Sequence, residues 1–161
     1  MNDKKRGFSE IVKIFTTWRF LLFSAWKLPL ILITGVRVKQ VTAEDVIVSV
    51  PYNYINKNPF NSMYFAVEAM AAELSTGILT ILHTDGENIS MLVSKLEAKY
   101  YKKAISRVHF VCNDGDKILK CIKEVIQTKK SKTCVLKSKG YDLNNICVAE
   151  FDITWSLKKR N

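Results

Sequence analysis

The segment Ser62–Leu82 reads SMYFAVEAMAAELSTGILTIL, in which almost every residue is apolar or small. A helix of this composition is apolar on nearly every side, so we expect it to be buried. Asn58-Pro59 marks its predicted start, because asparagine caps free amides and proline suits the first helical position. Thr84-Asp85-Gly86 marks its end. The sequence therefore predicts one long core helix.

This helix carries Glu73 on an otherwise small and apolar face. Burial of an ionisable group is costly unless the group is paired or neutral, and such groups are enriched at sites of chemistry. Glu73 is therefore the first catalytic candidate. The alternative is a carboxylate that caps strand amides or pairs with a basic residue across a subunit interface. Glu68 lies about 140° away around the helix, so it cannot form a close acid/base pair with Glu73, and we interpret it as structural.

Segments with strand patterns precede and follow this helix in the sequence. A hairpin is predicted before it, at Val36–Val41 and Val46–Tyr52. Further strands are predicted after it, with Lys139–Asp142 as a turn, at Leu92–Tyr100, Val108–Cys112, Thr133–Lys137 and Cys147–Leu157. An amphipathic helix is predicted to follow Asp114-Gly115-Asp116 as an insertion. The fold class is therefore α+β, with an antiparallel sheet wrapped around a long central helix.

The first of these later strands has a clear alternation. Leu92, Leu96, Ala98 and Tyr100 are predicted to share one face, and lysines and a glutamate occupy the other. Such a strand packs one face against the core and exposes the other face to solvent.

Residues 1–34 are predicted to form a helical segment that packs on a domain of residues 35–161. Phe8–Trp26 has helical periodicity. The apolar run Phe20–Val36 is interrupted by Lys27 and Pro29, so a membrane-spanning helix or a secretory signal is disfavoured. Aromatic and basic residues mix in this segment, which leaves peripheral membrane contact as an alternative, through Trp18, Arg19, Trp26 and Lys27.

Composition limits the classes of partner. The chain has 161 residues, 48% of them hydrophobic, and a formal net charge of +10, which favours one domain and an anionic partner. No nucleic-acid recognition motif is present, so nucleic acid is disfavoured. The four cysteines have no Cys-x-x-Cys spacing, so neither a metal site nor a cofactor is predicted. Cysteines among apolar neighbours suit a reducing compartment, which favours the cytoplasm.

The segment from Asn58 to Gly77 resembles the acyl-CoA thioesterase branch of the hotdog fold. In that branch the helix commonly starts with Asn-x-x-Gly-x-x-His-Gly-Gly, and an acidic residue follows the second glycine by seven positions. Here Asn58 and Glu73 match, whereas Tyr64 replaces the histidine, and Phe65 and Ala66 replace the two glycines. The chain is also similar to an uncharacterised bacterial hotdog subfamily with an Asn-x-x-x-Ser-x-Tyr-Phe start and an Ala-Glu-Leu-x-x-Gly helix.

The resemblance implies a thioesterase acting on acyl-CoA or another acyl thioester. Glu73 would activate water or attack the thioester carbonyl, and amides at Phe65 and Ala66 would stabilise the oxyanion. Substrate or water would be oriented by Tyr64, Ser62 and Asn58, although Asn58 is favoured as a helix cap. Met70 belongs to the apolar helix face that would line the acyl tunnel.

The resemblance further implies a homodimer or dimer of dimers with continuous sheets. The phosphates of coenzyme A would meet basic residues at a subunit boundary, among them Lys95, Lys99, Lys102, Lys103 and Arg107. The same residues suit a solvated strand edge. The alternative function is a noncatalytic acyl-CoA-binding or sensing protein. A hydratase or dehydratase is disfavoured, because it would need a histidine where Tyr64 stands.

Overall fold

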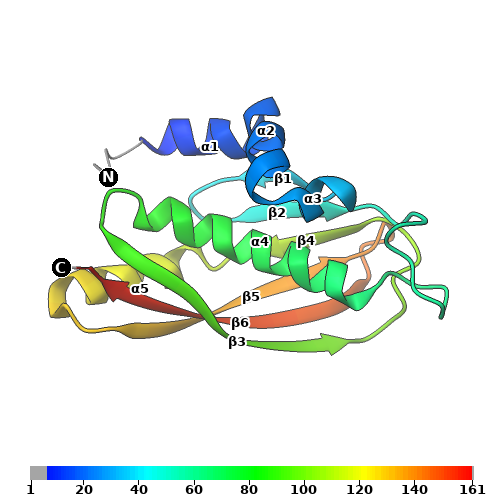
Figure 1. The fold of residues 1–161 in the computed structure, drawn as a ribbon. Coiled ribbons are helices and arrows are strands. Elements are labelled where there is room, and N and C mark those ends of the chain that lie inside the picture. Colours follow the sequence, from blue (N-terminus) through cyan, green and yellow to red (C-terminus); the bar gives the residue numbers. More distant parts are fainter. Residues whose placement is uncertain (1–6, 161) are drawn as a thin grey trace.

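Residues 7–160 are described by a computed structural model, in which five helices and six strands follow one another (Figure 1). The helices are α1 (Phe8–Thr16), α2 (Trp18–Lys27), α3 (Pro29–Ile33), α4 (Phe65–Thr84) and α5 (Gly115–Thr128). The strands are β1 (Arg37–Val41), β2 (Val46–Val50), β3 (Ile89–Tyr100), β4 (Val108–Cys112), β5 (Lys132–Tyr141) and β6 (Cys147–Lys159). All neighbouring strands pair antiparallel, in the order β1-β2-β4-β5-β6-β3. The predicted α+β class, with an antiparallel sheet and a central helix, is confirmed.

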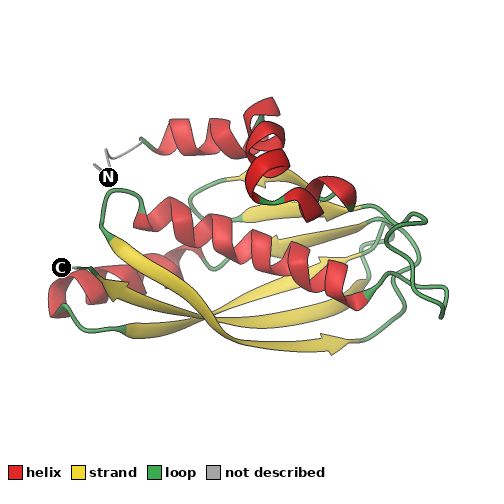
Figure 2. Ribbon diagram, in the orientation of Figure 1, coloured by secondary structure: helices red, strands yellow, loops and turns green. Residues whose placement is uncertain are grey.

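Helix α4 lies along one face of the curved sheet, as Figure 2 shows. Its small residues let the strands approach closely: a Cβ atom at Gly77 would lie 3.4 Å from the Trp155 ring of β6. The Trp155 indole also donates a hydrogen bond to the Thr76 hydroxyl at 3.1 Å. Ser75 and Ser138 hydroxyls share a buried hydrogen bond of 2.8 Å. The small residues of α4 thus serve packing against the sheet.

The start of α4 differs from the prediction. The helix begins at Phe65, and its N-cap position is Tyr64, which makes no side-chain capping bond. The Asn58 carboxamide instead holds the preceding loop: its Oδ1 accepts from the Phe60 and Ser62 amides, and its Nδ2 donates to the Met63 carbonyl. The interpretation of Asn58 as a helix cap is therefore wrong, because the loop uses its hydrogen bonds.

Two strand predictions also need correction. A bulge between Val93 and Lys95 changes the phase of β3, so Leu92 faces away from the side shared by Leu96, Ala98 and Tyr100. Register shows this directly, since Leu92 pairs with the outward-facing Ser156 and Leu96 pairs with the buried Ile153. The chain also continues through Lys139–Tyr141 as part of β5, and the turn comes later, at residues 142–146.

The N-terminal segment is helical, as predicted, but it forms three separate helices. The predicted helix over Phe8–Trp26 is broken at Thr17, whose backbone is extended. Ile11, Phe20 and Ile31 are buried and anchor the three helices to the common core. Figure 1 places α1–α3 on the side of the molecule where β1 and β2 lie.

Within the described residues, one helix is long and apolar enough to cross a membrane by length and composition, and it is α4. Burial accounts for its composition, because 61% of its most apolar window is buried inside the protein. The core helix of a globular domain has the same properties.

Candidate active site

A groove of about 840 Å³ runs between α4 and the N-terminal helices. Its walls are almost wholly apolar, and one side is formed by α1–α3 through Phe15, Phe23, Leu28, Pro29, Leu30 and Ile31. The other side is α4, with Met91 of β3 and Trp155 of β6 at the sheet. Apolar cavities of this size, with few polar groups, are typical of small-molecule sites. The groove suits an extended hydrocarbon chain.

Glu73 is the single carboxylate among the described residues that line this groove. The side chain is exposed, which corrects the expectation that α4 is covered on that side. The sheet and the N-terminal helices leave this sector of α4 open as the groove wall. Partial desolvation by the apolar groove walls still raises the pKa of Glu73 above its ordinary value, because it disfavours the charged form. A carboxylate with a raised pKa is a stronger base than an ordinary glutamate, which suits it to accept a proton.

A second, more polar cavity of about 320 Å³ lies where α4 begins. Glu68 lines it and is only 4% exposed, and within the described residues its Oε2 has no hydrogen-bond partner. Burial raises the pKa of Glu68 to about 7. Burial and the nearby Glu68 charge together raise the pKa of Tyr100 to about 12.

Sequence reasoning assigned Glu68 no special environment. A usable signal was its spacing from Ala71, Ala72 and Ser75, which places it on the helix face that turns out to be most deeply buried. Because α4 is apolar on nearly every side, the sequence did not show which sector would face the sheet.

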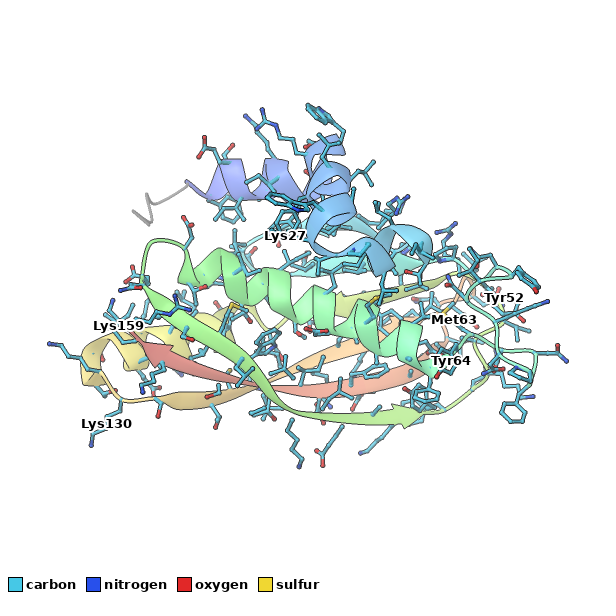
Figure 3. The ribbon with its side chains drawn as sticks, viewed as in Figure 1. Lys27, Tyr52, Met63, Tyr64, Lys130 and Lys159 are labelled. Atoms are coloured by element: carbon cyan, nitrogen blue, oxygen red, sulfur yellow. The ribbon has the colours of Figure 1, made fainter. Side chains whose placement is uncertain are left out.

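The predicted site residues are divided between the two cavities. Ala66, Met70 and Glu73 line the large groove. Asn58, Ser62 and Phe65 line the smaller cavity together with Glu68. Tyr64 lines neither of the two and is 45% exposed, with its ring 5.0 Å from that of Phe65. Figure 3 shows Tyr64 at the end of α4 where the helix starts, and Lys27 above α4 on the groove side.

The start of α4 can bind negative charge through its backbone. The first amides of a helix lack intrahelical partners, and the helix dipole adds a partial positive charge there. The Tyr64 side chain does not cap them. Phe65 occupies the first helical position and Ala66 the second, so both amides belong to this first turn.

Several of the basic residues proposed to meet phosphates have partners within the chain. Lys95 pairs with Glu97 at 2.8 Å, and Lys102 with Asp142 at 3.4 Å. Lys103 donates to the Phe60 carbonyl at 2.9 Å, and Arg107 to the Ser49 hydroxyl at 3.0 Å. Lys102 and Lys103 nevertheless line the smaller cavity, beside the start of α4. No group of three or more potential metal ligands occurs within the described residues 7–160.

A family described as a domain of unknown function (DUF4442) matches residues 16–157. The chain belongs to this family. The match begins at the end of α1, includes the central helix and the first five strands, and ends within β6. Among curated proteins, no sequence matches the chain significantly.

Solved structures show the same fold. A Pseudomonas aeruginosa protein of unknown function, described as a probable thioesterase, has a TM-score of 0.79 at 17% identity and covers 99% of this chain and 100% of its own. A Chlorobaculum tepidum protein of unknown function has a TM-score of 0.76 at 16% identity, over 94% and 96%. A thioesterase from Haemophilus influenzae has a TM-score of 0.64 at 10% identity, over 98% and 94%. The protein described here, a member of the DUF4442 family, therefore has the hotdog fold.

Proposed function

We propose that the protein is a thioesterase that hydrolyses acyl-CoA or another acyl thioester, such as one on an acyl carrier protein. One observation carries the proposal: among the described residues, Glu73 is the single carboxylate on the wall of an apolar groove of about 840 Å³, and its pKa is raised. The groove offers room for the acyl chain, with Met70 on its wall, and Glu73 offers the base or nucleophile. Structural relatives that are described as thioesterases support the same reaction.

In the hydrolysis, a water oxygen attacks the thioester carbonyl while Glu73 accepts the water proton. The tetrahedral oxyanion is stabilised by the amides of Phe65 and Ala66. Breakage of the C–S bond then releases the carboxylic acid and a thiol, which takes up the proton. Direct attack by Glu73 is the second route, through an anhydride that water opens. Asn58, Ser62 and Tyr64 orient the substrate or the water.

Distance along α4 constrains how these groups meet. Glu73 follows Ala66 by seven residues, which corresponds to about 10 Å along a helix axis. A base and an oxyanion donor must both lie about 3 Å from reacting atoms of one carbonyl. One copy of α4 therefore does not bring its own Glu73 and its own first turn to the same thioester.

A homodimer that pairs through β3 would bring the first turn of α4 in one copy close to the Glu73 of the partner subunit. β3 is an edge strand of twelve residues, and its inward-facing Leu96 and Tyr100 are exposed. Tyr100, at one end of β3, lines the cavity beside the start of α4, and Met91, near the other end, lines the groove. Antiparallel pairing of two β3 edges places the Tyr100 end of one copy beside the Met91 end of the other. The first-turn amides of one α4 and the Glu73 of the partner subunit then act on the same thioester.

We further propose that the protein is cytoplasmic and that it forms a homodimer or a dimer of dimers. Lys102 and Lys103, which line the cavity beside the start of α4, would exchange their contacts with Asp142 and the Phe60 carbonyl for the phosphates of coenzyme A.

A noncatalytic acyl-CoA-binding protein is the second candidate, favoured by one observation. The Phe65 side chain occupies the start of α4, where it narrows the approach to the helix amides. Such a protein would hold the acyl chain in the groove without turnover.

The test is release of free thiol from a series of short to long acyl-CoAs by the wild type, Glu73→Gln and Glu124→Gln. Glu124 is an exposed-face residue of α5 that pairs with Lys132, so its variant is the matched control. We expect turnover by the wild type and the control, and its loss in a folded Glu73→Gln variant. Saturable acyl-CoA binding without turnover in all three would instead establish the binding protein.

A further inference from the structure

Helix α2 has apolar residues on two opposite sides. On one side, Phe20 is buried against the body of the protein together with the small polar residue Ser24. Trp18, Leu22 and Trp26 follow each other at four-residue steps and lie on the other side, with exposed fractions of 65%, 61% and 80%. At about 100° per residue these three span an arc of about 80°, centred nearly opposite Phe20 and Ser24. The solvent-facing side of such a helix normally carries polar residues, so exposed apolar residues on that side are unusual.

Neighbouring helices add to the exposed apolar surface. Phe8 of α1 and Leu30 and Ile33 of α3 are also more than half exposed. Single exposed apolar residues are common, whereas a contiguous patch marks an interaction site. We call the three exposed α2 residues Trp18, Leu22 and Trp26 the outer apolar face.

The charges around the outer apolar face are mostly positive. Lys13, Arg19 and Lys27 lie on α1 and α2, and Glu10 is the one acidic residue between positions 7 and 35. The Lys27 ammonium lies 4.3 Å from the centre of the Trp26 ring, so the cation sits at the edge of the apolar face. Tryptophan prefers the boundary between lipid headgroups and acyl chains, and lysine and arginine favour anionic headgroups.

We propose that the outer apolar face docks on an anionic lipid membrane, with α2 lying in the plane of the interface. Trp18, Leu22 and Trp26 insert at the boundary of the acyl chains, and Arg19 and Lys27 contact the headgroups. A second copy of the same face is a poorer occupant, because it would bring the two sets of cations together. The inference does not depend on the thioesterase proposal, since it needs only the surface of α1–α3.

The experiment is co-sedimentation of the full chain with vesicles of phosphatidylcholine alone or with about one third phosphatidylglycerol. The variants are the double substitution Trp18→Ser/Trp26→Ser and the matched control Tyr54→Ser, which removes an 84% exposed aromatic ring from a loop outside the face. Circular dichroism checks the fold of each. Trp155 is only 5% exposed, so a blue shift of tryptophan emission on vesicles reports Trp18 and Trp26.

We expect the wild type and Tyr54→Ser to bind the anionic vesicles, to lose binding at high salt, and to bind neutral vesicles weakly. The double variant should bind at least about tenfold more weakly. Equal vesicle binding by the double variant, or no vesicle binding by the wild type, would overturn the proposal. So would a change of oligomeric state in the double variant, measured without vesicles, because that result would make the face a contact between copies.

Discussion

Replacement of Glu68 by glutamine should remove a large part of the pH dependence of stability. Glu68 is 4% exposed, its Oε2 lacks a partner within the described residues, and burial raises its pKa from 4.5 to about 7. Because the folded-state pKa lies above that of the unfolded chain, the folded protein keeps a proton that the unfolded chain has already lost. Stability from this group is therefore full below pH 4.5 and is lost as the pH rises through 7.

The size of the effect follows from the two pKa values. A shift from 4.5 to about 7 corresponds to about 3 kcal/mol over the whole range, and to about 2.5 kcal/mol between pH 5 and pH 8. Glutamine has nearly the same shape as the protonated acid and does not ionise. The variant should thus lack this contribution to the change of the free energy of unfolding with pH, whatever its stability at one fixed pH.

The assay is urea denaturation at pH 5 and pH 8, followed by circular dichroism, on the wild type, Glu68→Gln and Glu10→Gln. Glu10 is exposed on α1, so its variant should keep the wild-type pH dependence. We expect the wild type to lose about 2.5 kcal/mol relative to Glu68→Gln on going from pH 5 to pH 8. Parallel changes in the wild type and Glu68→Gln would refute the reasoning, because they would mean that Glu68 is ionised normally in the folded protein.

Four further outcomes are expected. The rate of thioester hydrolysis should fall on acidification with an apparent pKa above that of an ordinary glutamate, because burial raises the pKa of Glu73, and a pH–rate profile measures this. Ala66→Pro should lower kcat by about 10²-fold or more while the protein stays folded, because proline in the first helical turn removes one amide donor; steady-state kinetics with circular dichroism test it. Leu96→Glu should convert the proposed dimer to monomer in sedimentation velocity, because a charge on the inward face of the β3 edge opposes pairing. Gly140→Ala should lower the free energy of unfolding by about 1–3 kcal/mol in urea, because the new Cβ would lie 2.7 Å from the buried Phe110 ring.

Elements whose pattern directly encodes burial could be predicted from the sequence. The α4 segment is too apolar for any position but the core, and Val46, Val48 and Val50 alternate so regularly that only a strand fits. Residues Cys147 to Leu157 alternate in the same way, and β6 follows them. The fold class follows from these elements because an apolar helix needs a sheet around it.

Other features depend on choices that the local sequence leaves open. Asn58 can cap a helix or hold a loop with the same hydrogen-bonding groups, and its use in the loop moves the start of α4 to Phe65. The bulge after Val93 turns Leu92 outward without any glycine to mark it.

The roles of the two α4 carboxylates could not be separated for a related reason. A helix that is apolar on all sides gives no sign of which sector will face open space. Packing of α1–α3 leaves Glu73 on the groove wall, and packing of the sheet covers Glu68. The environment of each carboxylate is therefore a property of the whole fold.

The spacing of seven residues between Ala66 and Glu73 has a consequence for mixtures of inactive subunits. If each site takes its oxyanion donors from one copy and its carboxylate from the other, Ala66→Pro and Glu73→Gln damage different halves of the site. In a heterodimer of the two variants, one site carries both defects and the other carries neither. Random exchange of equal amounts makes about half of the dimers mixed, so about a quarter of the wild-type activity should return. Two inactive preparations would thus complement each other in the test tube.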